Sequence, residues 1–522
     1  MAFRDYRRLW HAARVLARND ALFPKEYEAL LPREARIARR LIGSRHRKDD
    51  PSPPGVRLAR SLESLGPAYI KLGQVLATRP DIVGAGVATA LEQLQDRLPP
   101  FSTDTAKAVI AQSLGKPVDA LFASLSEPVA AASIAQVHDG MTATDPPVRV
   151  AVKVLRPGIE ESFGRDLAAF ALAARLAERW SPEARRLRPL AMVGQLANSV
   201  ALELDLRMEA AGASELEERT RKEPDFRVPH IDWNRTADRV LTSEWIDGIS
   251  VRNRDALIAA GHDPKHIAQV VIRSFLTQAL RDGYFHADMH PGNLFVDKEG
   301  RLVAVDFGIM GRLDDQMRRF MAETLAGFLQ RDYQRVAQVH YDVAFVPAHH
   351  PVETFAQALR AIGEPIFGRQ AKDVSMAKLL AQLFETTRRF DMVAQPQLVL
   401  LQKTMMVVEG VARSLDPDFD IWEASRPVVE KWMLERMGPE GRLRDAADSV
   451  SALGRVAQNL PQLLKNAEII SAMLADGGVR LHPESVMLIA REQAARTRHV
   501  RIAIWIAAGA LGVLALLPFI AG

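Results

Sequence analysis

The stretch His286–Gly308 constrains the fold of this chain more than any other feature. It contains two short apolar runs with polar residues on either side. The runs Leu294–Val296 and Leu302–Val305 are separated by a turn sequence that ends at Gly300. Apolar runs of this length on either side of such a turn predict a β-hairpin. The residues just before and just after the hairpin are polar, and their identity indicates the chemistry of the region.

Three oxygen-bearing side chains flank this hairpin: Asp288 and Asn293 precede it and Asp306 follows it. We therefore expect them to meet at one end of two adjacent strands. Phosphoryl transfer needs such a set, because one carboxylate accepts the hydroxyl proton while an amide and a second carboxylate hold Mg²⁺ on the phosphates. The Asp-x4-Asn spacing followed by Asp-Phe-Gly is typical of the catalytic loop and metal motif of protein-kinase-like enzymes. Asp288 is thus the candidate base, and Asn293 and Asp306 are the candidate Mg²⁺ ligands.

Two histidines in this loop offer a competing interpretation. His286 and His290 are four residues apart, which is the spacing of a zinc-binding pair on a helix. However, Pro291 and Gly292 follow at once, and no third ligand of matching context appears in the sequence. We therefore expect these histidines to brace the loop.

A strand upstream carries a candidate phosphate-binding lysine. Val148–Leu155 alternates with period two, so Lys153 faces away from its neighbouring valines. A lysine on the third strand of a small sheet grips the α- and β-phosphates in kinase-like enzymes. About twenty residues earlier, where a glycine-rich phosphate loop belongs, alanines and one serine occur instead, which narrows the backbone freedom and predicts altered nucleotide geometry or preference. The residues expected to contact nucleotide there are Val129, Ala130, Ala131, Ala132, Ser133, Ile134, Ala135, Gln136 and Val137.

The partner of Lys153 is left open by spacing. Residues 158–220 are expected to be helical, and Glu203, Asp205 and Glu209 could each supply the carboxylate that pairs with a strand lysine in kinases. Further along, Arg239–Gly248 is expected to form a strand that runs into a hinge. We place Glu244 and Ile246 there, where an adenine would meet backbone groups.

The segment Ser64–Asp81 is expected to form a helix that starts near Pro67 and ends near Pro80. Lys71 and Gln74 lie three residues apart and hence on one face of it. Spacing alone makes this an ordinary amphipathic helix.

The ends of the chain are basic. The chain has 522 residues and a formal net charge of +4, and the largest excess of Lys and Arg over Asp and Glu lies in residues 1–48. A second basic cluster, Arg496–Arg501, precedes the uncharged stretch Ile502–Gly522, which as a helix is roughly 31 Å long and thus just spans a bilayer. With cations only before it, the bulk of the protein is expected to stay cytoplasmic, on an anionic membrane surface. No aromatic-interleaved basic stripe supports a nucleic-acid partner, and cysteine is absent, which excludes disulfides and thiolate metal sites.

Taken together, these residues resemble the UbiB family of atypical kinases, which supports ubiquinone biosynthesis. The motifs that carry the resemblance stand in the family's order: Lys71-x-Gly73-Gln74, the alanine-rich loop 130–133, Lys153, Glu203-x-Asp205 with Glu209, Asp288 to Asn293, and Asp306-Phe307-Gly308. After Asp306 the sequence runs almost directly into a helical pattern without an Ala-Pro-Glu motif, so a docked protein substrate finds little support.

The resemblance implies an α+β, protein-kinase-like bilobal fold with a helical N-terminal extension over the active site. The expected parts are a basic segment 1–48, the extension 56–125, an N-terminal lobe 126–248, a mostly helical C-terminal lobe 249–490 and a transmembrane tail 500–522. The resemblance also implies catalytic roles for Lys71 and Gln74 beside Asp288, and Glu203 as the partner of Lys153. It implies ATP and Mg²⁺ as cofactors.

The function implied by the resemblance is an atypical kinase or ATPase that supports ubiquinone biosynthesis at the bacterial inner membrane. Its implied partners are membrane lipid, quinone precursors, and the hydroxylases and methyltransferases of the quinone ring, with regulation of the hydroxylation steps. Two alternatives remain. The catalytic loop also looks like that of aminoglycoside and choline kinases, which phosphorylate small hydroxyl compounds, and a nucleotide-gated scaffold could extract quinone precursors without catalysis.

The tail generates a first prediction. Deletion from Arg501 onward should leave a soluble protein that still binds nucleotide, because the span contributes no active-site residue. The measurement is sedimentation with membranes after a high-salt wash. If the truncated protein still pellets, the tail is not the main anchor, and the basic residues 1–48 become the next candidate.

Overall fold

The computed structural model describes residues 2–21, 52–77, 83–91, 94, 98–180, 185, 188–367, 386, 389–392 and 396–437. The chain divides into two compact units, Met1–Met433 and Leu434–Gly522, and only the last residues of one helix in the second unit are described. The predicted transmembrane tail, 500–522, therefore lies outside the described residues. Within the described ranges no helix is long and apolar enough to cross a membrane.

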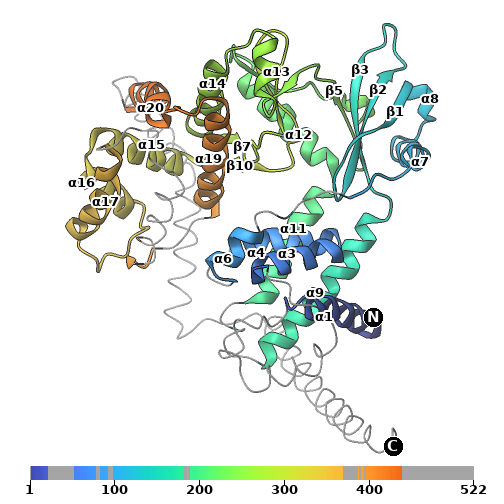
Figure 1. Ribbon diagram of the computed structural model, residues 1–522, viewed down its shortest axis with the longest axis horizontal. Coiled ribbons are helices and arrows are strands. Elements are labelled where there is room, and N and C mark those ends of the chain that lie inside the picture. Colours follow the sequence, from blue (N-terminus) through green and yellow to red (C-terminus); the bar gives the residue numbers. More distant parts are fainter. Residues whose placement is uncertain are drawn as a thin grey trace, which may run out of the picture. The chain divides into compact units, whose positions relative to one another are not determined.

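A four-stranded antiparallel sheet forms the N-terminal lobe (Figure 1). Its strands in spatial order are β1 (Phe122–Ala131), β2 (Ala135–Thr142), β3 (Arg149–Leu155) and β5 (Val240–Glu244). The alternation predicted for β3 is confirmed, since Val150, Val152 and Val154 are buried in one cluster with Val109 and Ile110 of α7 (Thr103–Leu114). The alternation therefore leaves Lys153 on the opposite face of the sheet.

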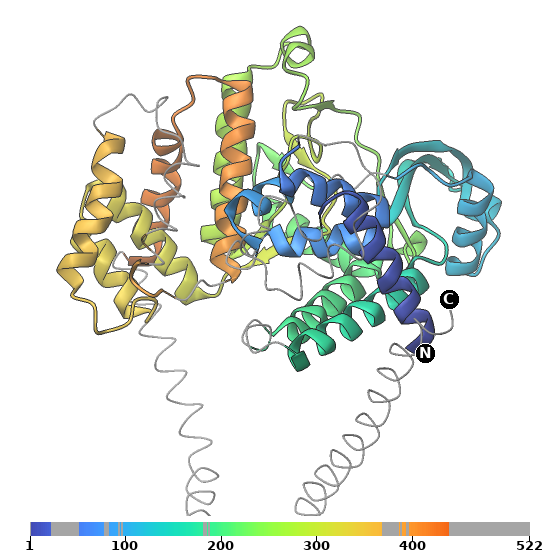
Figure 2. The same cartoon turned by 60° about the horizontal axis from the view of Figure 1, so that its bottom comes forward.

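Three helices lie between β3 and β5 in the sequence: α9 (Ile159–Trp180), α11 (Pro189–Glu203) and α12 (Leu206–Thr220). The helical N-terminal extension packs on the first two (Figure 2). It consists of α1 (Ala2–Arg18), α3 (Pro54–Leu65), α4 (Pro67–Ala77) and α6 (Ala85–Leu91). The predicted start of a helix at Pro67 is confirmed, whereas its predicted end near Pro80 falls in residues that the structure does not describe.

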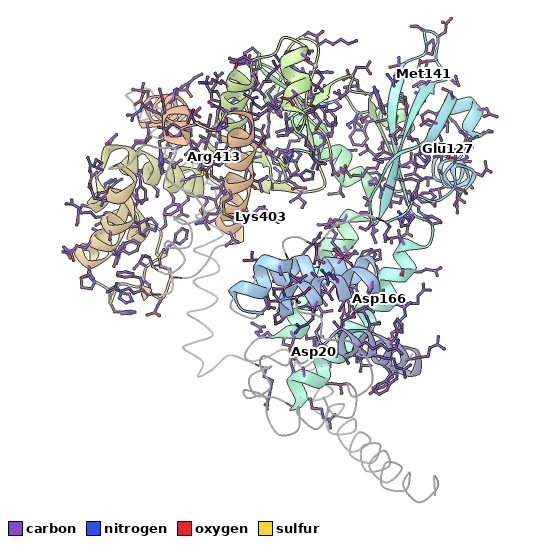
Figure 3. All side chains as sticks on the ribbon, in the orientation of Figure 1. Asp20, Glu127, Met141, Asp166, Lys403 and Arg413 are labelled. Carbon is purple, nitrogen blue, oxygen red and sulfur yellow. The ribbon has the colours of Figure 1, made fainter. Side chains whose placement is uncertain are left out.

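Apolar side chains attach the extension to α9. Tyr69 of α4 meets Phe170 of α9 edge to face, with ring centroids 4.8 Å apart. Arg8 of α1 forms an ion pair with Asp166, which Figure 3 labels on α9. Ile134, from the alanine-rich loop, also packs against this apolar cluster. The extension and the candidate phosphate loop thus share one packed region.

The C-terminal lobe is mainly helical and contains the predicted hairpin. Strands β8 (Leu294–Val296) and β9 (Leu302–Ala304) pair antiparallel, which confirms it. They form a four-stranded sheet with β4 (Phe226–Arg227) and β6 (Ile249–Ser250). The turn needs Gly300, which has φ +83°, a backbone conformation that side chains with Cβ rarely adopt.

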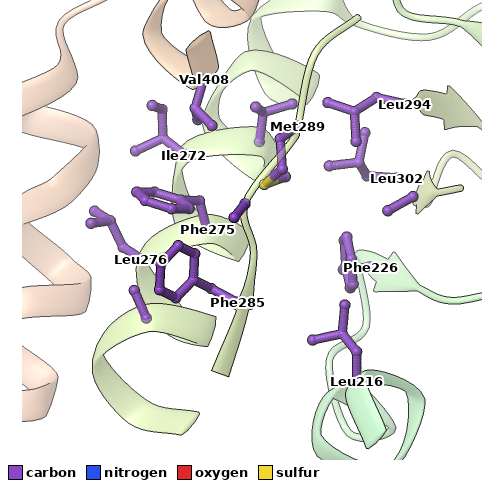
Figure 4. Packing of buried hydrophobic residues seen from close by; sticks show 14 of the residues in the cluster. Leu216, Phe226, Ile272, Phe275, Leu276, Phe285, Met289, Leu294, Leu302 and Val408 are labelled. Atoms are coloured by element: carbon purple, nitrogen blue, oxygen red, sulfur yellow. The ribbon is translucent and has the colours of Figure 1, made fainter. Parts of the chain in front are cut away.

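The central helix of this lobe, α14 (Pro264–Thr277), packs along α19 (Pro396–Leu415), and Figure 4 shows the core beside them. Phe275 and Phe285 meet edge to face there, with ring centroids 5.7 Å apart. The remaining elements are α8 (Val118–Leu121), the short 3-10 helix Trp233–Arg235, α13 (Arg254–Ala259), the π-helical turn Gln278–Asp282, β7 (Tyr284–His286), β10 (Met310–Arg312), α15 (Asp315–Gln330), α16 (Tyr333–Asp342), α17 (Val352–Phe367) and α20 (Ile421–Met437).

A buried histidine in α16 generates a prediction about stability. Burial lowers the pKa of His340 to about 4, although Nδ1 donates to the carbonyl of Val336 at 2.8 Å. Between pH 4 and 6.5 the unfolded chain therefore binds a proton that the folded chain does not, and the free energy of unfolding falls as the pH is lowered. From pH 7 to pH 5 this loss is about 2 kcal/mol.

The substitution His340→Phe should abolish this part of the pH dependence, because phenylalanine does not titrate and the site already borders Phe320 and Phe355. Denaturant unfolding of both proteins at pH 7 and pH 5 measures the difference. An equal loss of stability in both would show that His340 is not responsible.

Candidate active site

Lys153 lies at the centre of the candidate site. Its Nζ donates to both carboxylate oxygens of Glu209, at 2.7 and 2.9 Å, and the two side chains are 16% and 11% exposed. Glu209 lies in the first turn of α12, and its Oε1 also accepts from the backbone N–H of Phe307 at 3.3 Å. One carboxylate thus joins the sheet, helix α12 and the Asp-Phe-Gly motif.

The implied pairing of Glu203 with Lys153 is wrong. Glu203 Oε2 instead lies 2.6 Å from Nζ of Lys71, on α4 of the extension. The physical reason is a break between two helices: Glu203 is the last residue of α11, and Asp205 is the N-cap of α12, where its carboxylate accepts from the backbone N–H of Arg207. The three acidic candidates therefore serve three different partners. Aspartate as an N-cap was the signal in the sequence that could have located the break.

Asp306 completes the group around Lys153. Its Oδ1 lies 3.5 Å from Lys153 Nζ and accepts from the N–H of Gly308 at 3.3 Å. The residue has φ +67°, which is uncommon outside glycine and characteristic of sites that hold strain for function. Lys153 holds the pKa of the Asp306 carboxyl below its usual range, although burial opposes this. Burial lowers the pKa of Lys153, but Asp306 and Glu209 together raise it above its ordinary value. At neutral pH both groups are therefore charged.

The loop before the hairpin brings Asp288 and Asn293 together. Asn293 Nδ2 donates to the backbone carbonyl of Asp288 at 3.1 Å and to its Oδ2 at 3.4 Å. This orients the amide so that its oxygen remains available for a cation. The expected bracing by histidines is confirmed, since His286 Nδ1 accepts from the N–H of Asp288 at 3.1 Å and His290 Nδ1 from that of Gly292 at 2.9 Å.

Comparison with known proteins agrees with this geometry. Residues 93–340 match the ABC1 atypical kinase-like domain, and residues 359–420 match the UbiB helical domain. The chain is 41% identical over 449 residues to a probable protein kinase UbiB of Marinobacter nauticus, covering 85% of this chain and 81% of that protein. It belongs to the UbiB family. A probable protein kinase UbiB of Azotobacter vinelandii is 43% identical over 417 residues, which cover 79% of this chain and 77% of the relative.

A solved structure supports the fold alone. The complex of Rv3197 with erythromycin, from Mycobacterium tuberculosis, matches with a TM-score of 0.50 and 22% identity, over 70% of this chain and 93% of that one. The predicted kinase-like α+β fold is confirmed. Such a domain implies nucleotide binding.

The alanine-rich loop of this UbiB-family chain is closed by backbone hydrogen bonds. The N–H of Ala132 donates to the carbonyl of Ala135 at 2.8 Å, and the guanidinium of Arg156 donates to the carbonyl of Ala132 at 2.9 Å. Among the predicted contact residues, the side chain of Gln136 is committed elsewhere: it exchanges hydrogen bonds with the backbone of Phe101, at 2.9 and 3.1 Å. The side-chain amide of Gln136 is thus occupied by the partly buried backbone of Phe101, and its contact with nucleotide stays a prediction.

The predicted hinge follows β5. Glu244 closes that strand, and its carboxylate accepts from the guanidinium of Arg227 at 2.9 and 3.1 Å. Its backbone N–H donates to the carbonyl of His230 at 2.8 Å. Ile246 lies in the irregular stretch 245–248 and is half-buried. Glu244 is therefore a structural anchor of the hinge, while Ile246 stays a predicted contact of adenine.

Sequence reasoning missed Thr404, a residue of the C-terminal lobe that contacts the backbone of the catalytic loop. The hydroxyl of Thr404, buried on α19, shares its proton between the carbonyl of Ala287 at 3.0 Å, between His286 and Asp288, and the carbonyl of Leu400 at 2.9 Å, one turn earlier on the same helix. Thr404 belongs to the region that matches the UbiB helical domain. A threonine in a helical pattern carries no signal of this contact in the sequence.

The two ion pairs generate a matched prediction. Glu209→Gln should weaken nucleotide binding by about tenfold or more, because it releases Lys153 from its position opposite the phosphates. It should also lower the melting temperature, since removing one partner of a buried ion pair costs about 3–5 kcal/mol. Glu203→Gln is the comparison, and it should weaken nucleotide binding less than Glu209→Gln does, because its direct partner is Lys71 and not Lys153. Titration with a fluorescent nucleotide distinguishes them, and the reverse ranking would restore Glu203 as the partner of Lys153.

Proposed function

We propose that this UbiB-family protein binds Mg-ATP at the site around Lys153 and hydrolyses it or transfers its γ-phosphoryl group. The observation that carries the proposal is the meeting of one ammonium with two carboxylates from different elements, Glu209 of α12 and Asp306 after the hairpin. Glu209 holds the lysine, and Asp306 lies beside it where a phosphate-bound cation would be. Kinase-like enzymes use such a group to position the phosphates.

The residues fit a magnesium ion by their chemistry. Mg²⁺ prefers oxygen ligands, and the site offers the carboxylate of Asp306, ionised because of Lys153, and the amide oxygen of Asn293. When bound, the ion would neutralise charge that develops on the phosphates. Asp288, whose side chain is 40% exposed beside Asn293, is placed to accept the proton of an attacking hydroxyl or water.

The extension is proposed to gate the reaction. Lys71 forms an ion pair with Glu203, which lies at the break between α11 and α12, six residues before Glu209. The same acidic segment therefore contacts both the extension, through Lys71, and the sheet, through Lys153. Displacement of α4 would release Glu203 and change the start of α12. Gln74 lies one turn further on α4, and its catalytic role, like that of Lys71, is part of this proposal.

The acceptor is proposed to be a small hydroxyl compound, a lipid or water rather than a docked protein. The structure favours this because α15 begins at Asp315, only a few residues beyond Gly308, and the short strand β10 fills the interval. No long activation segment intervenes to bind a peptide. Family membership supports a role in ubiquinone biosynthesis, in which the protein regulates quinone-ring hydroxylation beside its membrane-bound partners.

The proposal is tested with Asp306→Asn. Loss of a direct carboxylate ligand removes several kcal/mol of charge stabilisation, so we expect Mg-ATP affinity to fall at least about 100-fold. Calorimetric titration at fixed Mg²⁺ measures it, and Asp342→Asn, an exposed change on α16, serves as the control. An Asp306→Asn protein that keeps its melting transition and binds Mg-ATP as tightly as the wild type would refute the metal assignment.

The fate of the phosphate is measured separately. Full-length protein purified with lipid is supplied with labelled ATP, and release of phosphate is compared with transfer to extracted lipids and to proteins. Transfer to lipid, or hydrolysis alone, agrees with the short segment after Gly308. Dominant transfer to protein would refute the proposed acceptor class.

A further inference from the structure

A cluster of two histidines and one aspartate lies in the C-terminal lobe and takes no part in the site around Lys153. His349 and His350 occupy the loop between α16 and α17, and Asp391 lies in the short described stretch before α19. Nε2 of His349 and Nε2 of His350 lie 3.8 and 3.4 Å from the same oxygen, Oδ2 of Asp391. Three atoms that can each donate a lone pair to a metal thus lie within 4.8 Å of one another.

These separations suit a tetrahedral metal ion. Zinc takes imidazole nitrogen and carboxylate oxygen at about 2.0–2.2 Å, which places neighbouring ligand atoms about 3.3 Å apart. The distances of 3.4 and 3.8 Å to Asp391 Oδ2 therefore need to change by only a few tenths of an ångström. The two imidazole nitrogens lie within 4.8 Å of each other and would approach by up to about 1.5 Å. The side chains of His349 and Asp391 are 66% and 70% exposed, so they are free to make this adjustment and the ion can enter from solvent.

The cluster is positioned by buried neighbours. The hydroxyl of Tyr341 donates to the backbone carbonyl of His350 at 2.8 Å, which fixes the loop. The ring of His350 packs edge to face on Phe390, with centroids 5.2 Å apart, and Phe390 itself is buried in the core of α16 and α17. Because Asp391 directly follows Phe390, the same core anchors both sides of the cluster.

An ordinary ion pair is the simpler interpretation, and the chain supplies one for comparison. His230 Nδ1 lies 3.4 Å from Glu217, and within the described residues no second histidine forms an ion pair with that carboxylate. At Asp391 two imidazoles share one oxygen, and their ring centroids are only 4.1 Å apart. A single ion pair needs only one of these imidazoles, whereas a metal ion would use both together with the carboxylate.

We propose that His349, His350 and Asp391 bind a borderline divalent metal ion, with zinc as the natural occupant and water in the fourth position. Two imidazole nitrogens select zinc over magnesium and calcium, which prefer oxygen ligands. Residues 349 and 350 lie after the kinase-like match, which ends at 340, and before the helical domain. Asp391 lies within the helical domain. The ion would link the loop between α16 and α17 to the helical domain, across 41 residues of sequence.

The test uses the full-length protein after treatment with a chelator, with Zn²⁺ as the titrant and Mg²⁺ present in excess to occupy oxygen-rich sites. Asp391→Asn is the sharpest variant. Asp391 has φ +51°, and asparagine tolerates this left-handed conformation as well as aspartate does, so the backbone is preserved while the charge is lost. His349→Ala removes an exposed ligand, and His230→Ala is the matched control.

The wild type and His230→Ala are expected to bind one equivalent of Zn²⁺ that raises the melting temperature. Substituting residues that only hydrogen-bond to metal ligands weakens metal binding by about 10- to 100-fold. Because Asp391→Asn and His349→Ala change ligands themselves, each should lower the affinity for that equivalent of Zn²⁺ at least about tenfold. The zinc-dependent rise in melting temperature should disappear with it. The proposal is refuted if both variants bind and respond to Zn²⁺ as the wild type does. It is also refuted if the wild type binds no Zn²⁺, or if the Zn²⁺ that it binds is lost in His230→Ala.

Discussion

The contact of Lys153 with Glu209 and Asp306 is the interaction on which the rest of this structure depends. It joins the sheet of the N-terminal lobe, helix α12 and the end of the hairpin, with Lys153 and Glu209 largely withdrawn from water and Asp306 about half exposed. Lys153 lowers the pKa of the Asp306 carboxyl, and this ionised, partly exposed carboxylate favours a divalent cation. Since removing one partner of a buried pair leaves the other charge uncompensated at a cost of about 3–5 kcal/mol, this contact also holds the elements in register.

The acidic segment between α11 and α12 extends this network to the N-terminal extension. Because the helix breaks at Asp205, Glu203 and Glu209 point to different neighbours, and Lys71 and Lys153 each receive one carboxylate. The break thus makes one short segment sensitive to both the extension and the nucleotide lysine.

The catalytic loop has little regular structure of its own and is held from several sides. His286 and His290 accept backbone hydrogen bonds within it, the ring of His286 packs on Phe307, and Thr404 fixes the carbonyl of Ala287 from α19. Hence the C-terminal helical region contributes directly to the geometry of Asp288 and Asn293.

The sequence by itself determined the parts that local patterns encode: the hairpin from two apolar runs, the direction of Lys153 from a period of two, and the helix start at Pro67. It also placed the proposed cation ligands, Asn293 and Asp306, on either side of that hairpin. Only the tertiary structure decided which acid meets which lysine, that Gln136 serves the backbone of Phe101, and that Thr404 and the cluster at Asp391 exist at all. Those contacts join residues distant in the chain. No periodicity or spacing records them, because they depend on how packed helices and strands place side chains in space.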